Sequence, residues 1–288
     1  MPNRIDECFQ VLRADNEKAF IAYICAGDPD FPRTVDLAFA LEKAGVDILE
    51  VGIPFSDPLA DGLVNQLAAQ RALEAGATVQ GVLDCVGQIR QRSQIPIVLY
   101  SYLNPIFQFG FEHFHRQADQ AGVDGLLILD LPPEEVSRAV AAPLSRGVTR
   151  TATERRGYSM NLEMPKDGPI HVRLIAPTTP PDRIERICSG AAGFIYYVSR
   201  EGVTGVQSNV ASSLRERVGE IRRHTKLPIA VGFGISTPEQ AREVASLADA
   251  VVVGSAIVQK ISEHATKPDL AARIGQFVEP LAAASKGH

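Results

Sequence analysis

A glutamate stands inside one of the most apolar stretches of the chain, where it could act as both acid and base. Glu50 lies in the string ILEVGIPF, among leucine, isoleucine, valine and phenylalanine side chains. Burying a charged carboxylate in such surroundings is costly, so its pKa is expected to rise. A carboxyl group with a raised pKa can both give and take a proton near neutral pH. An ion pair with a basic residue, or a position facing solvent, would explain the same glutamate without catalysis.

The loop that follows Glu50 brings two more carboxylates. It reads PFSDPLADG over residues 54–62 and contains Asp57 and Asp61. Asp57 also suits a turn or a helix cap. Asp61 could reach over the end of the strand toward Glu50. Two carboxylates in unlike environments, one apolar and one polar, make a natural acid–base pair.

Glycines follow two later apolar runs and predict an anion site. The string GFG (residues 232–234) follows PIAV, and GS (residues 254–255) follows AVVV and opens a helical pattern. Backbone amides at such turns and at a helix N-terminus bind phosphate. Glycines also serve tight turns, so each string alone is a weak signal and the two together are more specific. A third segment, SREGVTG (residues 199–205), is hinged by glycine and could close over a ligand.

Eight short apolar runs must position these residues, and amphipathic segments separate the runs. Near-continuous apolar runs, rather than strict alternation, are typical of strands covered on both faces of a parallel sheet. Residues 34–43, for example, carry apolar side chains at helical spacing. Eight strands alternating with helices favour a closed barrel over an open doubly wound sheet, which spacing alone does not exclude. The expected strands are Phe20–Cys25, Asp47–Gly52, Ile97–Ser101, Gly125–Leu129, His171–Ala176, Gly193–Val198, Pro228–Gly232 and Ala250–Gly254.

Both ends of the chain add a helical segment to this repeating pattern. A helix around Ile5–Leu12 would close the bottom of the barrel, and Leu270–Ala284 would form its last helix. We therefore predict the α/β class, with residues 1–288 forming a single (β/α)8 TIM-barrel domain that has an extra N-terminal helix. The chemical residues above then lie where strands end, which is where such barrels hold their active sites.

One stretch departs from the pattern. A helix is expected after Pro133, in the string EEVSRAVAAPLSR, and should turn directly into the next strand. Residues 147–166 intervene without an apolar period, whereas such a connection normally takes roughly 2–6 residues. We predict an inserted surface loop on the N-terminal face, opposite the active site, with partner docking as the alternative.

Composition excludes several classes of function. The net charge of −5 argues against nucleic acid as a partner. Four scattered cysteines without a CxxC pair predict neither a disulfide framework nor a zinc site, and thus a reducing cytoplasm. The first residues do not read as a signal peptide, and no apolar run reaches the roughly 18 residues of a membrane span. His113 and His115, two apart at the start of a helix, favour a solvated surface over a metal site.

Eight strings, in order along nearly the whole chain, resemble the tryptophan synthase alpha chain family. The resemblance implies a barrel that cleaves indole-3-glycerol phosphate into indole and glyceraldehyde 3-phosphate, a retro-aldol reaction that uses no cofactor and no metal. The matching strings are AGDPD (26–30), LEVGIPFSDPLADG (49–62), SYLNPIF (101–107), GVDGLLILDLPPEE (122–135), APTTP (176–180), GFIYYVSREGVTG (193–205), VGFGIS (231–236) and VVVGSAIV (251–258).

The resemblance also implies roles for single residues. Glu50 matches the family's catalytic glutamate, which protonates the indole ring carbon and then takes the proton of the glycerol hydroxyl. Asp61 matches its second carboxylate, which holds the indole N–H and stabilises the positive indolenine. The residues that match the family's indole pocket, its closing loop and its phosphate cup are Tyr102, Tyr196, Thr204, Gly205, Phe233, Gly234, Gly254 and Ser255.

The resemblance implies a partner as well. In the family, indole passes through a tunnel to a beta chain that carries pyridoxal phosphate, within an αββα complex. The docking face would include Asp57, Pro58 and the neighbourhood of Asn104–Pro105. Two alternatives stay open: a free-standing lyase that turns over quickly alone, and a weakly catalytic paralogue that regulates the beta chain. A barrel for another sugar phosphate is a third, against which the pocket aromatic residues and the SDPLADG loop argue.

Three features depart from the family's usual pattern. Leu63-Val64-Asn65 follow Asp61-Gly62 where the family usually has a proline first, which could alter loop closure. Tyr100 stands where the family often has a smaller aliphatic residue, which could narrow the indole pocket. The segment 147–166 is the third. These departures bear on rate and coupling to the partner, since none removes a catalytic group.

Overall fold

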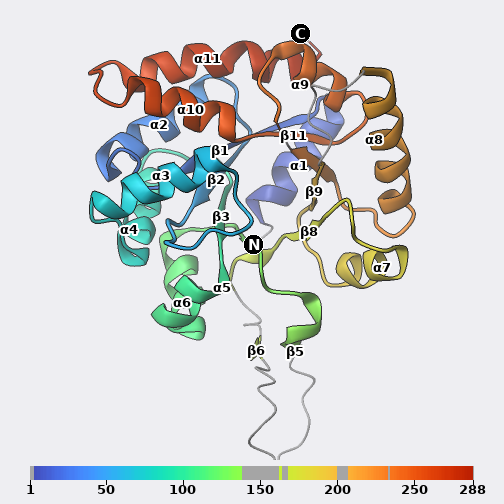
Figure 1. Cartoon of the computed structure of the whole chain (residues 1–288), viewed down its shortest axis with the longest axis horizontal. Coiled ribbons are helices and arrows are strands. Elements are labelled where there is room, and N and C mark those ends of the chain that lie inside the picture. Colours follow the sequence, from blue (N-terminus) through green and yellow to red (C-terminus); the bar gives the residue numbers. More distant parts are fainter. Residues whose placement is uncertain (1–2, 138–161, 164–167, 200–206, 233, 288) are drawn as a thin grey trace, which may run out of the picture.

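A closed ring of parallel strands forms the centre of the chain (Figure 1). The computed structural model describes residues 3–137, 162–163, 168–199, 207–232 and 234–287. Its main sheet has the order β7-β4-β3-β2-β1-β11-β10-β9-β8. The strands are β1 (Ala19–Cys25), β2 (Ile48–Gly52), β3 (Ile97–Ser101), β4 (Gly125–Ile128), β7 (Ile170–His171), β8 (Arg173–Ile175), β9 (Ile195–Val198), β10 (Ile229–Gly232) and β11 (Ala250–Val253).

The ring closes through one strand that is broken in two. Of the strands predicted from the sequence, only the fifth is divided: β7 pairs with β4, and β8 pairs with β9. Only Val172 separates the two halves, so neighbouring residues supply both edges of the sheet. The predicted TIM-barrel fold is thus confirmed, and its extent as a single domain over residues 1–288 stays a prediction.

Helices surround the ring, as the amphipathic segments predicted. In Figure 1, α10 and α11 run along the top of the view, α7 and α8 lie to the right, and α3 to α6 lie to the left. The helices are α1 (Arg4–Ala14), α2 (Phe31–Lys43), α3 (Leu63–Glu74), α4 (Val79–Arg90), α5 (Leu103–Phe109), α6 (Phe111–Ala121), α7 (Pro181–Ser189), α8 (Gln207–Arg222), α9 (Pro238–Ala245), α10 (Ser255–His264) and α11 (Leu270–Ser285). The predicted closing helix over Leu270–Ala284 is confirmed by α11, which packs against α2 and α9.

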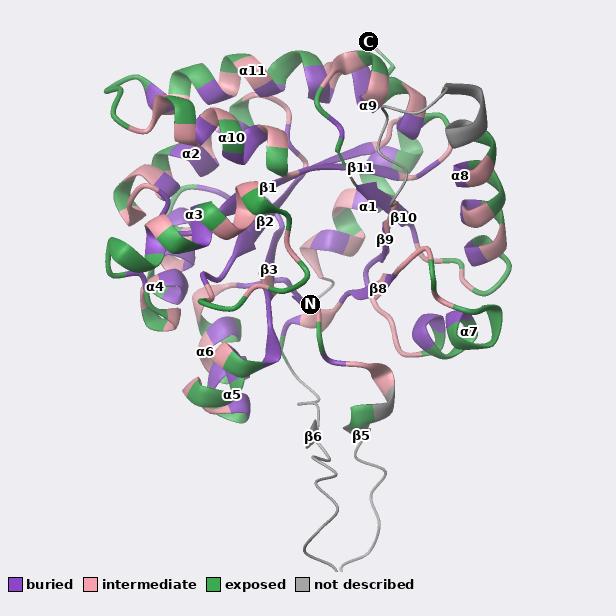
Figure 2. Ribbon diagram, viewed as in Figure 1, coloured by how far each residue is buried: buried purple, intermediate pink, exposed green. Residues whose placement is uncertain are grey.

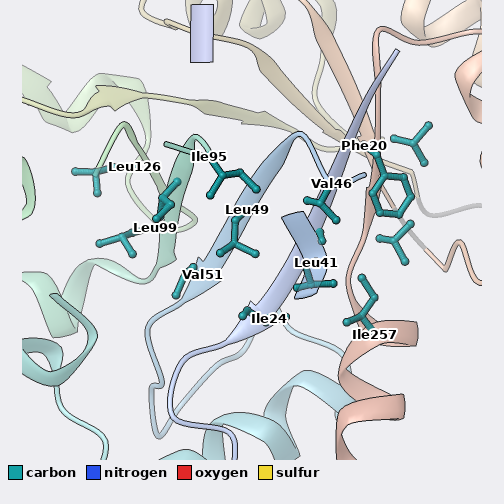
Figure 3. Packing of buried hydrophobic residues seen from close by; sticks show 14 of the residues in the cluster. Phe20, Ile24, Leu41, Val46, Leu49, Val51, Ile95, Leu99, Leu126 and Ile257 are labelled. Atoms are coloured by element: carbon teal, nitrogen blue, oxygen red, sulfur yellow. The ribbon is translucent and has the colours of Figure 1, made fainter. Parts of the chain in front are cut away.

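Most strands of the ring are buried on both faces (Figure 2). Alternate residues point outward, where Leu49 and Val51 of β2 lie in one apolar cluster with Leu41 of α2 and Ile257 of α10 (Figure 3). Burial of each such side chain stabilises the fold by roughly 1.5–3 kcal/mol. This is why the strands read as continuous apolar runs rather than as alternating ones.

The predicted N-terminal helix is confirmed by α1, which fills the interior of the ring from one end. Ile5 and Phe9 of α1 belong to the inner apolar cluster, and the Phe9 ring lies 5.9 Å from that of Phe194. A Cβ atom at Gly125 would lie 3.0 Å from Ile5, so the strand has glycine where the helix approaches most closely. The Asn3 side chain caps α1 by accepting the Ile5 N–H at 2.9 Å.

The segment after β4 corrects the helix predicted after Pro133. Residues Pro133–Glu135 form a single 3-10 turn, and Val136–Ser137 form the short strand β5, paired in parallel with β6 (Leu162–Glu163). The backbone is thus extended at β-branched Val136, a residue type that favours strands over helices. The rest of that predicted helix, and all of the predicted 147–166 loop except β6, lie outside the described residues.

His115 corrects the prediction of a solvated histidine pair. It lies on the inner face of α6 with Phe111, Phe114 and Ala118, at helical spacing, and only 2% of it is exposed. Its Nδ1 lies 2.7 Å from the Phe111 carbonyl oxygen, and its Nε2 lies 3.2 Å from Nε2 of His171. His113, on the outer face, is exposed as predicted.

Two features are absent from the part of the chain that the structure describes. No helix among these residues is long and apolar enough to cross a membrane. No group of three or more histidine, cysteine, aspartate or glutamate side chains among them is arranged to hold a metal ion. The four cysteines are free.

Candidate active site

Glu50 lies inside the ring, on the face of β2 that also carries Ile48. Side chains alternate along a strand, so the Glu50 side chain points inward while those of Leu49 and Val51 point outward. Only 1% of Glu50 is exposed, and no described residue gives its Oε1 atom a hydrogen bond. Burial, and secondly the charge of Asp61, raise the pKa of the Glu50 carboxyl from 4.5 to about 8. At neutral pH this carboxyl is therefore mostly protonated and able to donate.

Asp61 lies in the loop between β2 and α3, with both carboxylate oxygens held by tyrosines. The Tyr100 hydroxyl donates to Oδ1 at 2.9 Å, and the Tyr102 hydroxyl donates to Oδ2 at 2.8 Å. Tyr100 lies in β3, and Tyr102 is the residue that precedes α5. The backbone of each donor is therefore held by a strand or by the start of a helix. The arrangement presents a fixed negative group close to Glu50.

The backbone around Asp61 is tied to the same elements. The Ala60 N–H donates to the Tyr102 hydroxyl at 2.9 Å, and the Gln66 side chain donates to the Asp61 carbonyl oxygen at 2.8 Å. The helix after the loop begins at Leu63, with Gly62 as its cap residue and no side-chain cap. The loop is thus anchored on β3 and α3.

Two further tyrosines lie close to the two carboxyl groups. Tyr196 of β9 is 9% exposed, and its pKa is raised well above its ordinary value by burial and by the charges of Glu50 and Asp61. A Cβ at Gly232 would lie 2.9 Å from the Tyr196 hydroxyl, so the neighbouring strand leaves room for the ring. Tyr23 of β1 packs edge-on against Tyr100, with ring centroids 5.1 Å apart.

Tyr23 and the role of Tyr100 as a partner of Asp61 were missed by sequence reasoning. A signal existed in the string FIAYIC: Tyr23 is two residues from Ile21, so strand parity puts both on the same face. Parity does not reveal which hydroxyl reaches which carboxylate, because the Asp61 side chain comes from an irregular loop.

The glycines predicted to bind phosphate lie at the carboxyl ends of β10 and β11. Gly234 has a φ of 64°, and no described atom lies within 4 Å of where its Cβ would be. Gly254 precedes Ser255, the first residue of α10, and no described side chain caps the N–H groups there. Free N–H groups at a helix N-terminus attract anions. Thr204, Gly205 and Phe233 lie outside the described residues, so the structure places Gly234, Gly254 and Ser255 of this set.

A buried, protonated carboxyl group beside a second carboxylate, with a helix N-terminus that no described side chain caps, all at the carboxyl ends of barrel strands, is the arrangement typical of a TIM-barrel enzyme. A family model described as tryptophan synthase alpha chain matches residues 9–151 and 157–286. The chain belongs to the tryptophan synthase alpha chain family. It is a carbon–carbon lyase, the alpha subunit that cleaves indole-3-glycerol phosphate.

Individual relatives agree over the full length. A tryptophan synthase alpha chain of Opitutus terrae is 50% identical over 285 residues, which cover 99% of either chain. Another, from Citrifermentans bemidjiense, is 46% identical and covers 97% of this chain and 96% of its own. The crystal structure of the alpha subunit from Legionella pneumophila is 38% identical, with a TM-score of 0.82 and 99% of each chain covered. The gap in the family match falls within residues 147–166.

Proposed function

We propose that Glu50 and Asp61 carry out the cleavage of indole-3-glycerol phosphate by this chain. The observation that carries the proposal is a buried, protonated Glu50 carboxyl beside a carboxylate that two tyrosine hydroxyls hold in place. Such a pair supplies a proton donor and a fixed negative charge within one pocket, which are the two groups that the reaction needs.

In the proposed reaction Glu50 gives one proton to the substrate and takes one proton back from it. Glu50 donates its proton to indole carbon 3, and the ring becomes a cationic indolenine with its charge on nitrogen. The Glu50 carboxylate then takes the proton of the hydroxyl on the adjacent side-chain carbon. The bond between that carbon and the ring breaks, its electron pair returns to the ring, and an aldehyde forms. Asp61 accepts the indole N–H and stabilises the cation. No step requires a cofactor or a metal on this chain.

The remaining predicted site residues are proposed to hold the two ends of the substrate. Tyr102 and Tyr196 would contact the indole ring. Gly234, Gly254 and Ser255 would bind the phosphate, together with Gly205 and Phe233, while Thr204 would close toward Asp61. The N-terminus of α10, which no described side chain caps, supports the phosphate assignment.

We further propose that the chain works in an αββα complex with a beta chain that carries pyridoxal phosphate. Leu59, Leu63 and Phe107 are 84%, 68% and 46% exposed, and they are close in sequence to the predicted docking residues Asp57, Pro58 and Asn104–Pro105. These three residues lie in the segments that follow β2 and β3, and exposed apolar side chains that form one patch are typical of an interface. A cytoplasmic location stays a prediction from the sequence.

The test is indole release from indole-3-glycerol phosphate by the purified chain, with and without a beta chain. Slow release alone and strong stimulation by the partner are expected. Fast release alone would favour the free-standing lyase instead. Absence of release in both cases, with binding to the beta chain, would replace the proposal by the regulatory paralogue.

A further inference from the structure

Two tyrosines hold the carboxylate of Asp61, and one of them, Tyr100, has no role in the proposed reaction. Tyr102 both donates to Asp61 and accepts the Ala60 N–H, so it is tied to the loop twice. Tyr100 of β3 donates the second hydrogen bond, to the Oδ1 atom of Asp61. Since each carboxylate oxygen accepts more than one hydrogen bond, both oxygens keep capacity for a substrate N–H.

Tyr100 is placed by rigid structure, whereas Asp61 is not. The backbone of Tyr100 lies in β3, between Gly52 of β2 and Leu127 of β4, and its ring packs edge-on against Tyr23. Asp61 follows the exposed residues Leu59 and Ala60. A side chain on a loop acquires a defined position when groups on a strand hold it.

Strand parity explains why two tyrosines can share one carboxylate. Residues 100 and 102 are two apart, so both side chains lie on the inner face, while Ser101 between them is turned away and donates to the Tyr102 carbonyl oxygen. One hydroxyl meets each oxygen of Asp61. An aliphatic residue at position 100 would leave Oδ1 without this donor.

We propose that Tyr100 is a positioning residue that holds Asp61 ready to accept the indole N–H before substrate arrives. Tyr100 acts through Asp61 and touches no reacting atom. This inference rests on the proposed role of Asp61. It predicts that the Tyr100 hydroxyl stabilises the cationic indolenine more than it stabilises the neutral bound substrate. The reason is that a fixed negative charge interacts most strongly once the positive charge has developed.

The test is a double-mutant cycle in the full chain bound to its beta chain. Tyr100→Phe keeps the ring and removes the hydroxyl. We expect its kcat for indole release to fall about tenfold, as for the loss of one hydrogen bond to a charged group, with KM within about threefold. In the Asp61→Asn background the same change should alter kcat less than about twofold, because its partner is gone.

Tyr197→Phe is the matched control, since it removes a tyrosine hydroxyl from the outer face of β9. Its kcat should stay within about twofold of the unmodified chain, and thermal melting verifies that each variant folds. If Asp61→Asn is too slow for a steady-state assay, single-turnover indole release with enzyme in excess is compared in the two backgrounds, and the expected coupling is the same.

The outcomes separate the two claims. An inactive unmodified complex, or an Asp61→Asn variant with full activity, would overturn the proposed roles in catalysis. An active complex in which Tyr100→Phe leaves kcat unchanged would overturn the positioning role alone. Equal losses from Tyr100→Phe in the unmodified chain and in the Asp61→Asn background would overturn it as well, because Tyr100 would then act independently of the carboxylate.

Discussion

At the scale of single residues, the site depends on a carboxyl group that the fold keeps protonated. Glu50 has apolar neighbours, a nearby negative charge, and no described hydrogen-bond partner for Oε1. Each of these makes the ionised form unfavourable. The apolar string around Glu50 predicted the rise in pKa. It did not predict how Asp61 is held, because that depends on two hydroxyls from a different part of the chain.

Glu50→Gln should abolish indole release while folding and substrate binding are retained. Glutamine has nearly the same shape, and it is neutral, as the mostly protonated carboxyl is at pH 7, but it cannot deliver a proton. A loss of at least about a hundredfold in kcat is expected, the scale of a general acid–base contribution. Steady-state assays and inhibitor binding check this, and near-normal turnover would contradict the mechanism.

The pH dependence follows from the same carboxyl. Because Glu50 must first donate a proton, kcat/KM should fall as pH rises through about 8, the pKa in the free enzyme. The folded chain also binds this proton more tightly than the unfolded chain, where the pKa is near 4.5. The free energy of unfolding should therefore decline between about pH 4.5 and 8 by on the order of a few kcal/mol. Urea titrations of Glu50→Gln should lack this part of the decline. An equal decline in the variant would argue against the shifted pKa.

At the scale of elements, the proposed phosphate site depends on the ends of β10 and β11. Their positions were predictable, since apolar runs ending in glycine mark strand ends. Other elements were not: His115 was misjudged because the inner face of α6 is defined by its two phenylalanines, and the segment after Pro133 is a turn and a strand. At Val136 the residue type itself favours a strand, and its pairing with β6 joins a segment that the sequence pattern did not connect to it.

Gly234→Val should weaken phosphate binding through backbone strain rather than crowding. Its φ of 64° is a conformation that a β-branched residue rarely adopts, although the described residues leave the space around it open. A strain of about 1–3 kcal/mol would distort the turn and raise the inhibition constant of glycerol 3-phosphate roughly tenfold.

Gly76→Val provides the control for that experiment. Gly76 also has a positive φ, 86°, and open space around it among the described residues, and it follows the far end of α3. A similar loss of stability is expected, with an unchanged inhibition constant. If both variants weakened inhibition equally, general destabilisation rather than the turn at Gly234 would be responsible.

At the scale of the whole molecule, the inner core joins the first helix to almost every strand. Ile5 has no exposed surface, whereas Val11 on the opposite side of α1 is 61% exposed. Ile5→Ala should lower the free energy of unfolding by roughly 2–4 kcal/mol, and Val11→Ala by less than about 0.5 kcal/mol. Urea unfolding checks both values. A single transition in both variants is expected if residues 1–288 form one domain, and two transitions would contradict that prediction.

The position of α1 has a consequence for how the protein is made. Within residues 1–288, α1 precedes every strand of the inner cluster that covers its apolar face, and the residues of that cluster extend from Ala19 to Val252. Ile5 and Phe9 are therefore covered completely only after the later strands β9 to β11 have been made. Until then part of the apolar face of α1 stays exposed, and exposed apolar surface makes an incompletely folded chain prone to aggregation.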